Sequence, residues 1–331
     1  MFNSTDFWRR ACEIEGEDSF NECALELFRY QSVHVKVYKE YLGLLHKDPS
    51  SIKHFSEIPF LPVSLFKNNV VTDQHETPDF FFTSSGTTGQ ITSKHYLADP
   101  KIYEDSLLKC FTHFYGDPSH YCFLALLPSY LERSGSSLVY MMEKLILSGG
   151  HPMSGFFLHN HEELAQRMKV LSQNNEKIFL LGVTYALLDF FEKYPMQLSN
   201  VVVMETGGMK GKRKELVKSE IHELLTKGAG LKNIHSEYGM TELLSQSYST
   251  GAGIFSCTPW MKILISDLHD PFSQAKTGET GIIKVIDLAN IHSCAFLETQ
   301  DLGRIVSDNN FEVLGRMDHS ELRGCNLLVV Q

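Results

Sequence analysis

A run of hydroxyl and glycine residues follows three consecutive phenylalanines, Phe80 to Phe82. Glycines let a backbone approach an anion closely, and hydroxyls and amides donate hydrogen bonds to phosphate oxygens. The pattern predicts a phosphate-binding loop directly after a short strand, with a solvated surface loop as the alternative. The chain has no GxxxxGK[ST] motif, so this is not a P-loop. The residues of the expected loop are Ser84, Ser85, Gly86, Thr87, Thr88 and Gly89.

A second polar segment follows the short strand expected at 233–235. It offers an aromatic ring in Tyr238, a glycine in Gly239, a hydroxyl in Thr241 and a carboxylate in Glu242. Loops at strand ends are where open α/β sheets bind their ligands. The alternative is an ordinary helix N-terminus, with Ser236 or Thr241 as the capping residue.

Two further segments carry charged groups in short turn-like stretches. Asp301 lies in the acidic stretch 298–303, and Arg316 follows Gly315. Each stretch alone could be a plain β-turn. A glycine pair, Gly207 and Gly208, follows a predicted strand.

The elements that must position these segments alternate along most of the chain. The first 50 or so residues are helix-rich and amphipathic, and alternation of strands with helices from about 100 onward implies a mostly parallel sheet covered on both faces. After about 258, short strands with Gly, Asp and Asn turns favour a small antiparallel or barrel-like subdomain. We predict helices at 20–45, 101–114, 136–147, 161–171, 185–194 and 212–227, and strands at 79–82, 121–127, 177–182, 200–205, 233–235, 262–266, 281–287, 303–306 and 311–314.

The expected fold class is therefore α/β, divided into a core over 1–257, with a helical N-terminal segment, and a small β subdomain with the C-terminal tail over 258–331. The length of 331 residues suits about two domains, or one large domain with a satellite.

The composition limits which binding partners and which cellular compartment are expected. The 30 basic and 40 acidic residues leave a net charge of −10, which argues against nucleic acid or an anionic membrane as the main partner. The start of the chain lacks the apolar stretch of a signal peptide, and no apolar run is long enough to span a bilayer. Seven scattered cysteines without a CxxC motif suit free thiols in a reducing cytoplasm.

The order of these motifs resembles the adenylate-forming enzyme superfamily, over about three quarters of the chain. A closer resemblance is to its acyl-protein synthetases, the long-chain-fatty-acid–protein ligases of bacterial bioluminescence. The stretches that carry this closer resemblance are 58–67, 127–133, 136–141 and 207–212.

The resemblance implies a large domain of the adenylate-forming type that binds ATP and Mg²⁺. The first loop would hold the phosphates, Tyr238 with Gly239 and the Gly207–Gly208 pair would hold adenine, and Asp301 would hold the ribose hydroxyls. Thr241 would bind the α-phosphate and Glu242 would ligate Mg²⁺, which prefers a hard carboxylate together with phosphate oxygens. Arg316 would reach the ribose or a phosphate. Lys94 is displaced from the position that a phosphate-binding lysine has in the superfamily.

The implied reaction is activation of a carboxylic acid, expected to be a fatty acid, as acyl-AMP. The sequence ends at Gln331 without a counterpart of the superfamily's mobile C-terminal domain and its lysine, so we expect Lys210, Lys212 or Arg323 to assist, or a slower step. Cys325 lies where the acyl-protein synthetase branch has its acyl-accepting cysteine. A neighbouring arginine favours its thiolate, although a buried structural cysteine is the alternative.

Three outcomes remain open from the sequence. The acyl group passes to Cys325 and on to a partner such as an acyl reductase, or it passes to CoA or a carrier-protein thiol, or the chain is a catalytically lapsed nucleotide-binding protein. A metal site at His159 and His161 is a weaker reading than a helix that begins there, with Glu162 and Glu163 in its first turn.

Overall fold

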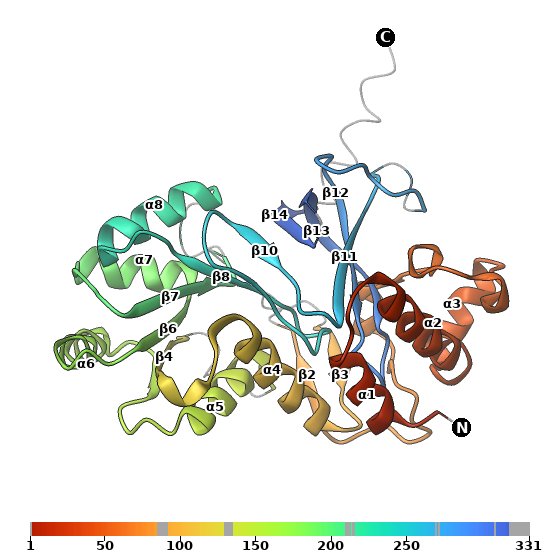
Figure 1. Ribbon diagram of the computed structural model, residues 1–331, viewed down its shortest axis with the longest axis horizontal. Helices are drawn as coiled ribbons and strands as arrows, with labels where there is room; N and C mark the ends of the chain where they lie inside the picture. Colours follow the sequence, from red (N-terminus) through yellow and green to blue (C-terminus); the bar gives the residue numbers. More distant parts are fainter. Residues whose placement is uncertain are drawn as a thin grey trace, which may run out of the picture.

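A long mixed sheet joins two wings of the molecule (Figure 1). The computed structural model describes residues 2–84, 92–128, 135–208, 213, 216–268, 270, 272–307 and 309–317. Among these residues one sheet contains, in order, β11 (Met261–Ser266), β12 (Gly281–Asp287), β13 (Phe296–Ser307), β14 (Asn310–Arg316), β10 (Ile254–Ser256), β9 (Ser247–Ser249), β8 (His235–Tyr238), β7 (Val201–Thr206), β6 (Ile178–Val183), β4 (Cys122–Leu126) and β5 (Gly155–Phe157), with β1 (Leu61–Pro62) beside β13.

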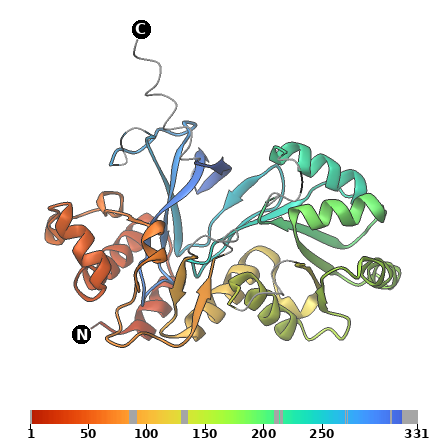
Figure 2. The same cartoon turned by 180° about the vertical axis from the view of Figure 1, so that it is seen from behind.

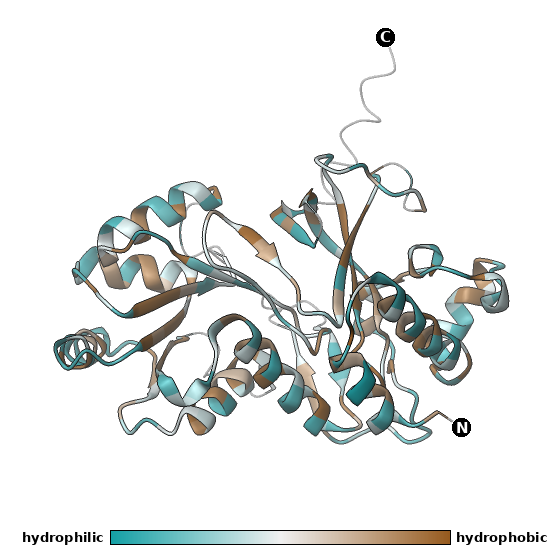
Figure 3. Ribbon diagram, in the orientation of Figure 1, coloured by the Kyte–Doolittle hydropathy of each residue, from teal (hydrophilic) through white to brown (hydrophobic). Residues whose placement is uncertain are grey.

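The strands β5, β4, β6, β7 and β8 are parallel and form one wing. All residues of β4 and β6 are buried, as expected for parallel strands covered on both faces. Figures 1 and 3 show α7 and α8 on one side of these largely apolar strands and α4 and α5 on the other. The helices of this wing are α4 (Pro100–Tyr115), α5 (Ser137–Gly149), α6 (His161–Gln173), α7 (Thr184–Lys193) and α8 (Lys218–Ala229).

The other wing is antiparallel along β11, β12, β13 and β14, and β14 joins β10 in the same sheet. Three N-terminal helices cover it: α1 (Ser4–Cys12), α2 (Glu17–His34) and α3 (Lys36–Leu44). The buried Gln31 of α2 donates to the carbonyl oxygens of Asn290 and Ile291 at 2.8 and 2.9 Å. Because a buried amide needs such partners, this contact ties the helices to the sheet.

A two-stranded antiparallel hairpin, β2 (Phe81–Thr83) with β3 (Lys94–Tyr96), lies between the wings in both views (Figure 2). Its connection carries the expected phosphate loop, of which 85–91 lie outside the described residues. Short 3-10 helices complete the framework: η1 (Pro49–Ser51), η2 (Phe55–Glu57), η3 (Val63–Lys67) and η4 (Pro118–His120).

The α/β class is confirmed, with the parallel strands in one wing and the antiparallel strands in the other. The helix expected at 20–45 is broken at Val35, and α8 begins at Lys218 rather than at 212. The strands β3, β5, β9 and β10 were not predicted, because three residues are too few to show a pattern. The pairing of β10 with β14 crosses the proposed division at 257/258, which stays a prediction.

Two of the alternative interpretations are wrong. The stretch from Glu298 to Gly303 could have been a plain turn, but it lies inside the twelve-residue strand β13. Among the described residues no helix begins after Tyr238, so the capping alternative fails for Ser236 and Thr241; Ser236 belongs to β8 and Thr241 to a turn.

Candidate nucleotide site

Asp301 is the point where three strands meet through their side chains. Its Oδ2 accepts a hydrogen bond from the Tyr238 hydroxyl at 3.0 Å, and its Oδ1 accepts one from Arg316 Nε at 3.2 Å. Tyr238 ends β8, while Asp301 and Arg316 are paired residues of β13 and β14. The structure therefore brings three of the predicted site residues together.

The strand β13 is irregular at this place, which sets the direction of the Asp301 side chain. The register between β13 and β14 shifts between Leu302 and Gly303, and the amide of Asp301 donates to Thr299 Oγ1 at 3.0 Å. Bulges of this kind redirect side chains and are frequent beside functional sites. The Asp301 side chain is 13% exposed and that of Arg316 is 76% exposed.

The ring of Tyr238 is held in an aromatic cluster. It packs edge-to-face against Phe255 at 6.1 Å and Phe311 at 5.7 Å between ring centroids. Burial, with the charge of Asp301 adding to it, raises the pKa of Tyr238 far above its usual range. The hydroxyl is therefore a fixed hydrogen-bond donor to Asp301.

Glu242 lies in the turn after β8 and is almost fully buried, with 6% of its surface exposed. Burial is the largest influence on the Glu242 carboxyl, and it raises the pKa. Ser93 and the charge of Arg316 lower the pKa, whereas the charge of Asp301 raises it. These interactions place Glu242 within electrostatic reach of the Asp301–Arg316 pair. A buried carboxylate either gains a cation as partner or holds a proton, and the raised pKa of Glu242 is consistent with both.

The base of the β2–β3 connection reaches the same turn. Ser84 Oγ accepts a hydrogen bond from the Ser93 amide at 2.9 Å, and the Ser84 amide donates to the Ser93 carbonyl at 3.1 Å. Ser93 in turn bonds the Glu242 carboxylate. The described ends of the first motif therefore converge on the second, while Ser85, Gly86, Thr87, Thr88 and Gly89 lie outside the described residues.

The end of β7 supplies the glycine pair. Gly207 and Gly208 have φ angles of 77° and 65°, a left-handed backbone that favours glycine. Immediately before them, Thr206 Oγ1 donates to Glu237 Oε2 at 2.6 Å, which connects the ends of β7 and β8.

Two carboxylates of this region were missed in the sequence. Burial and the charge of Glu205 raise the pKa of Glu237 to about 7. Glu205 is buried and bonds Lys218 at 2.7 Å and the Thr184 hydroxyl at 2.8 Å. The sequence did contain a sign of Glu205, because a glutamate at the end of the apolar strand 201–206 is expected to be buried and then requires polar partners.

The remaining candidates are Lys94 and four residues that the structure does not describe. The Lys94 ammonium lies 5.1 Å from the centre of the Phe81 ring, so nothing in this contact assigns it to a phosphate. The candidates Lys210, Lys212, Arg323 and Cys325 lie outside the described residues. The six cysteines of the described part are free thiols, as expected.

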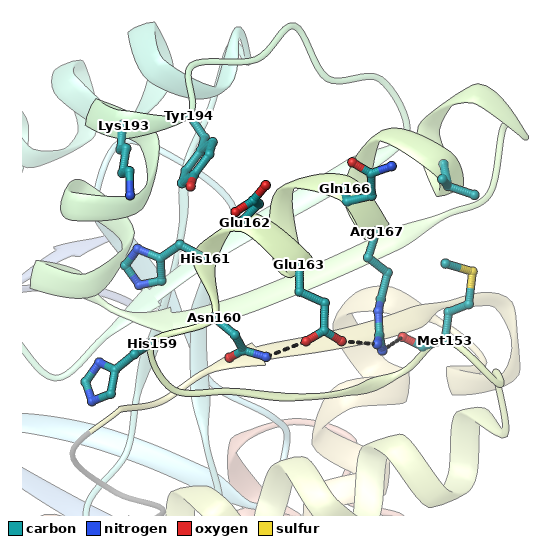
Figure 4. A pocket seen from close by; sticks show the side chains of 11 residues that line it. Met153, His159, Asn160, His161, Glu162, Glu163, Gln166, Arg167, Lys193 and Tyr194 are labelled. Carbon is teal, nitrogen blue, oxygen red and sulfur yellow. Dashed lines mark hydrogen bonds and ion pairs between the residues drawn. The ribbon is translucent and has the colours of Figure 1, made fainter.

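The weaker metal hypothesis falls in another part of the molecule. His159 and His161 line a hollow of about 790 Å³ at the start of α6, where Asn160 and Arg167 both bond Glu163 (Figure 4). In the part of the chain that the structure describes, no group of three His, Cys, Asp or Glu residues could hold a metal ion. The alternative is confirmed, because α6 begins at His161 with Glu162 and Glu163 in its first turn.

Solved structures with the same fold give this geometry a context. ATP-bound MatB from Rhodopseudomonas palustris has a TM-score of 0.54 and 17% identity, over 73% of this chain and 49% of that one. A 2-hydroxyisobutyryl-CoA ligase in complex with 2-HIB-AMP and CoA has a TM-score of 0.68 and 13% identity, over 94% of this chain and 71% of that one. The same ligase in an open conformation has a TM-score of 0.63 and 12% identity, over 91% and 71%.

The chain has the same fold as these neighbours. It spans about half the length of the MatB structure. No protein-family model and no curated protein matches the sequence. None of the described helices has the length and apolar character needed to cross a membrane.

Proposed function

We propose that this chain is an ATP-dependent acid–thiol ligase that forms acyl-AMP from a carboxylic acid and then passes the acyl group to a thiol. The observation that carries the proposal is the bonded set of Tyr238, Asp301 and Arg316 beside the buried Glu242. Support comes from the fold, since the neighbours with this architecture were solved with ATP bound or with 2-HIB-AMP and CoA.

The ribose hydroxyls would be bound by Asp301. A carboxylate has about four lone-pair positions, and Tyr238 and Arg316 use two, so two remain for a pair of neighbouring hydroxyl donors. Adenine would lie between Tyr238 with Gly239 and the Gly207–Gly208 backbone.

Mg²⁺ fits the residues present at Glu242. The Glu242 carboxylate oxygens are hard ligands, and burial raises the pKa of the group. A bound divalent cation would therefore offset the free-energy cost of burying its charge. When bound, the ion would neutralise phosphate charge. The chain itself would position the α-phosphate through Thr241 and the remaining phosphates through the loop from Ser84 to Gly89, which includes Ser85, Gly86, Thr87 and Thr88.

The carboxylic acid substrate must be positioned by the protein, but it needs no general base to activate it. Its carboxylate is already a nucleophile, and attack on the α-phosphorus expels pyrophosphate and leaves acyl-AMP. The residues of the site contribute by holding the nucleotide in line and stabilising charge on the phosphates.

We further propose, on the family resemblance, that the acid is a fatty acid and that Cys325 accepts the acyl group before an acyl reductase takes it in the cytoplasm. The second candidate acceptor is CoA or a carrier-protein thiol, which the CoA complex of the ligase neighbour favours. In both cases a thiolate attacks the acyl carbon and AMP leaves.

Formation of acyl-AMP is tested by the exchange of labelled pyrophosphate into ATP in the presence of a carboxylic acid. Exchange should appear with one class in a panel of alkyl, aryl and hydroxy acids, and Glu242→Gln should abolish it. Nucleotide binding without exchange against the whole panel would replace this proposal with a lapsed nucleotide-binding protein.

The acceptor is decided by intact mass after incubation with the active acid and ATP. An acyl adduct that disappears in Cys325→Ser identifies the chain's own thiol. Free acyl-CoA formed equally by the wild type and Cys325→Ser identifies CoA instead.

A further inference from the structure

His95 is a buried histidine of β3 that the proposed reaction has not used. It is 1% exposed, and the edge of its ring meets Phe66 at 5.6 Å between ring centroids. Its Nδ1 lies 2.8 Å from the carbonyl oxygen of Thr241, and its Nε2 lies 3.1 Å from Oδ1 of Asn290. A residue of the hairpin therefore touches the backbone of the turn that carries Glu242.

Asn290 extends this contact to the next residue of the turn. Its Nδ2 donates to the carbonyl oxygen of Glu242 at 2.8 Å. The backbone of Asn290 is also held on both sides. Its backbone N–H donates to the Asp287 carbonyl oxygen at 3.0 Å, and its backbone carbonyl oxygen accepts a hydrogen bond from Gln31. Two consecutive carbonyls of the turn are therefore held by two side chains from distant parts of the chain.

The contact with the turn depends on the tautomer of the histidine. Burial lowers the pKa of His95 to about 4, so the ring is neutral at pH 7 and carries one N–H. With the hydrogen on Nδ1, the ring donates directly to the Thr241 carbonyl, which is the shorter of the two contacts. With the hydrogen on Nε2, it would donate to Asn290 Oδ1 instead and leave the Thr241 carbonyl without this donor.

The hairpin meets this turn at two places. Ser93 lies beside the Glu242 side chain and lowers the pKa of its carboxyl, and His95, two residues further along the chain, contacts the Thr241 carbonyl before it. Both belong to the segment that closes the expected phosphate loop. A shift of about 1 Å in a positioned group lowers reaction rates steeply.

We propose that His95 and Asn290 are positioning residues that fix the Thr241–Glu242 turn against the β2–β3 hairpin and thereby hold the Glu242 carboxylate in place for magnesium-bound ATP. This inference rests on the function proposed above. Neither side chain is expected to touch the nucleotide; each acts through the backbone of the turn.

The test measures pyrophosphate exchange as a function of Mg²⁺ at fixed acid and ATP. His95→Ala should lower kcat at least tenfold and raise the Mg²⁺ concentration for half-maximal rate at least fivefold. Its binding of a fluorescent ATP analogue without Mg²⁺ should change less than threefold. His95→Asn keeps an N–H close to the position of Nδ1, and it should recover at least a third of the wild-type rate.

His235→Ala is the matched control for loss of a histidine. His235 is partly buried, and its Nδ1 bonds the Tyr115 hydroxyl at 3.1 Å. The control should lower Tm to a similar extent while its Mg²⁺ dependence stays within twofold of the wild type.

Asn290→Asp covers the case in which His95→Ala does not fold. It keeps size and acceptor but removes the donor to the Glu242 carbonyl, and it should raise the Mg²⁺ requirement at least fivefold. The inference is overturned if the folded variants keep a wild-type Mg²⁺ dependence, or if the control shifts it equally. Wild-type protein without exchange for any acid would instead reject the proposed function.

Discussion

Tyr238 and Asp301 are 63 residues apart in the sequence, yet the tyrosine hydroxyl donates to the aspartate at 3.0 Å. The bond crosses from β8, the last parallel strand, to β13 in the antiparallel wing. It therefore fixes the predicted adenine and ribose contacts relative to each other before any ligand arrives. Preorganisation of this kind reduces the free-energy cost of binding.

Asp301→Asn should weaken ATP binding with little effect on the fold. The neutral amide loses the charge-assisted bonds to ribose hydroxyls, so KM for ATP should rise about 10- to 100-fold, which corresponds to roughly 1.4–3 kcal/mol. Tyr238→Phe removes only the bond that orients the carboxylate and should raise KM less. Steady-state exchange kinetics measure both, and an unchanged KM in Asp301→Asn would remove Asp301 from the site.

Arg316→Gln should affect the nucleotide more than stability. Its side chain is 76% exposed and its ion pair with Asp301 spans 3.2 Å, so the pair contributes about 0.5 kcal/mol or less to folding. KM for ATP should rise several-fold at low salt, and the difference from wild type should shrink at 0.5 M salt. A loss of stability above about 1 kcal/mol without any change in KM would show that Arg316 is structural.

Glu237→Gln should change how stability depends on pH. The folded pKa of about 7 exceeds the unfolded value of about 4.3, so the native state retains a proton that the unfolded state loses. Wild-type stability should therefore fall as pH rises through this window, by up to roughly 3–4 kcal/mol. The glutamine can still accept from Thr206, so the variant should match wild type near pH 4 and exceed it near pH 8.5.

Urea unfolding at several pH values measures this difference. Parallel stability curves for wild type and Glu237→Gln between pH 4 and 8.5 would show that the carboxyl is ionised without cost in the fold.

Glu205→Gln should destabilise the fold by about 3 kcal/mol at pH 7, because it breaks a buried ion pair and leaves Lys218 without its partner. Burial alone would raise the pKa of Glu205, but His222, Lys218 and Ser236 outweigh it and lower it well below its usual range. The stabilising contribution is therefore present above the unfolded pKa and declines as pH falls below about 4.3.

Chemical unfolding at pH 7 and at pH 3 tests this sign, because the gap between wild type and variant should narrow at pH 3. Glu13→Gln, which breaks the exposed pair with Arg9, is the control and should cost less than about 1 kcal/mol. A loss no larger than the control's would show that the buried pair contributes nothing.

The sequence by itself determined the α/β class, most helices and strands such as β6 and β12, whereas it predicted only a short part of β13, the longest strand. Apolar strands such as β6 and amphipathic helices such as α4 are local patterns, so neighbouring residues in the sequence are enough to predict them. It also identified Tyr238, Glu242, Asp301 and Arg316 as candidates, because the order of their motifs along the chain resembles a known superfamily.

Only the tertiary structure decided that Asp301 lies inside a strand beside Tyr238, that Glu205 and His95 are buried among polar partners, and that Glu237 is partly buried against Thr206. These positions depend on strand register and on contacts between residues far apart in the chain. Nothing in the neighbouring residues encodes which distant carbonyl a buried side chain will meet, since packing of the whole core selects it.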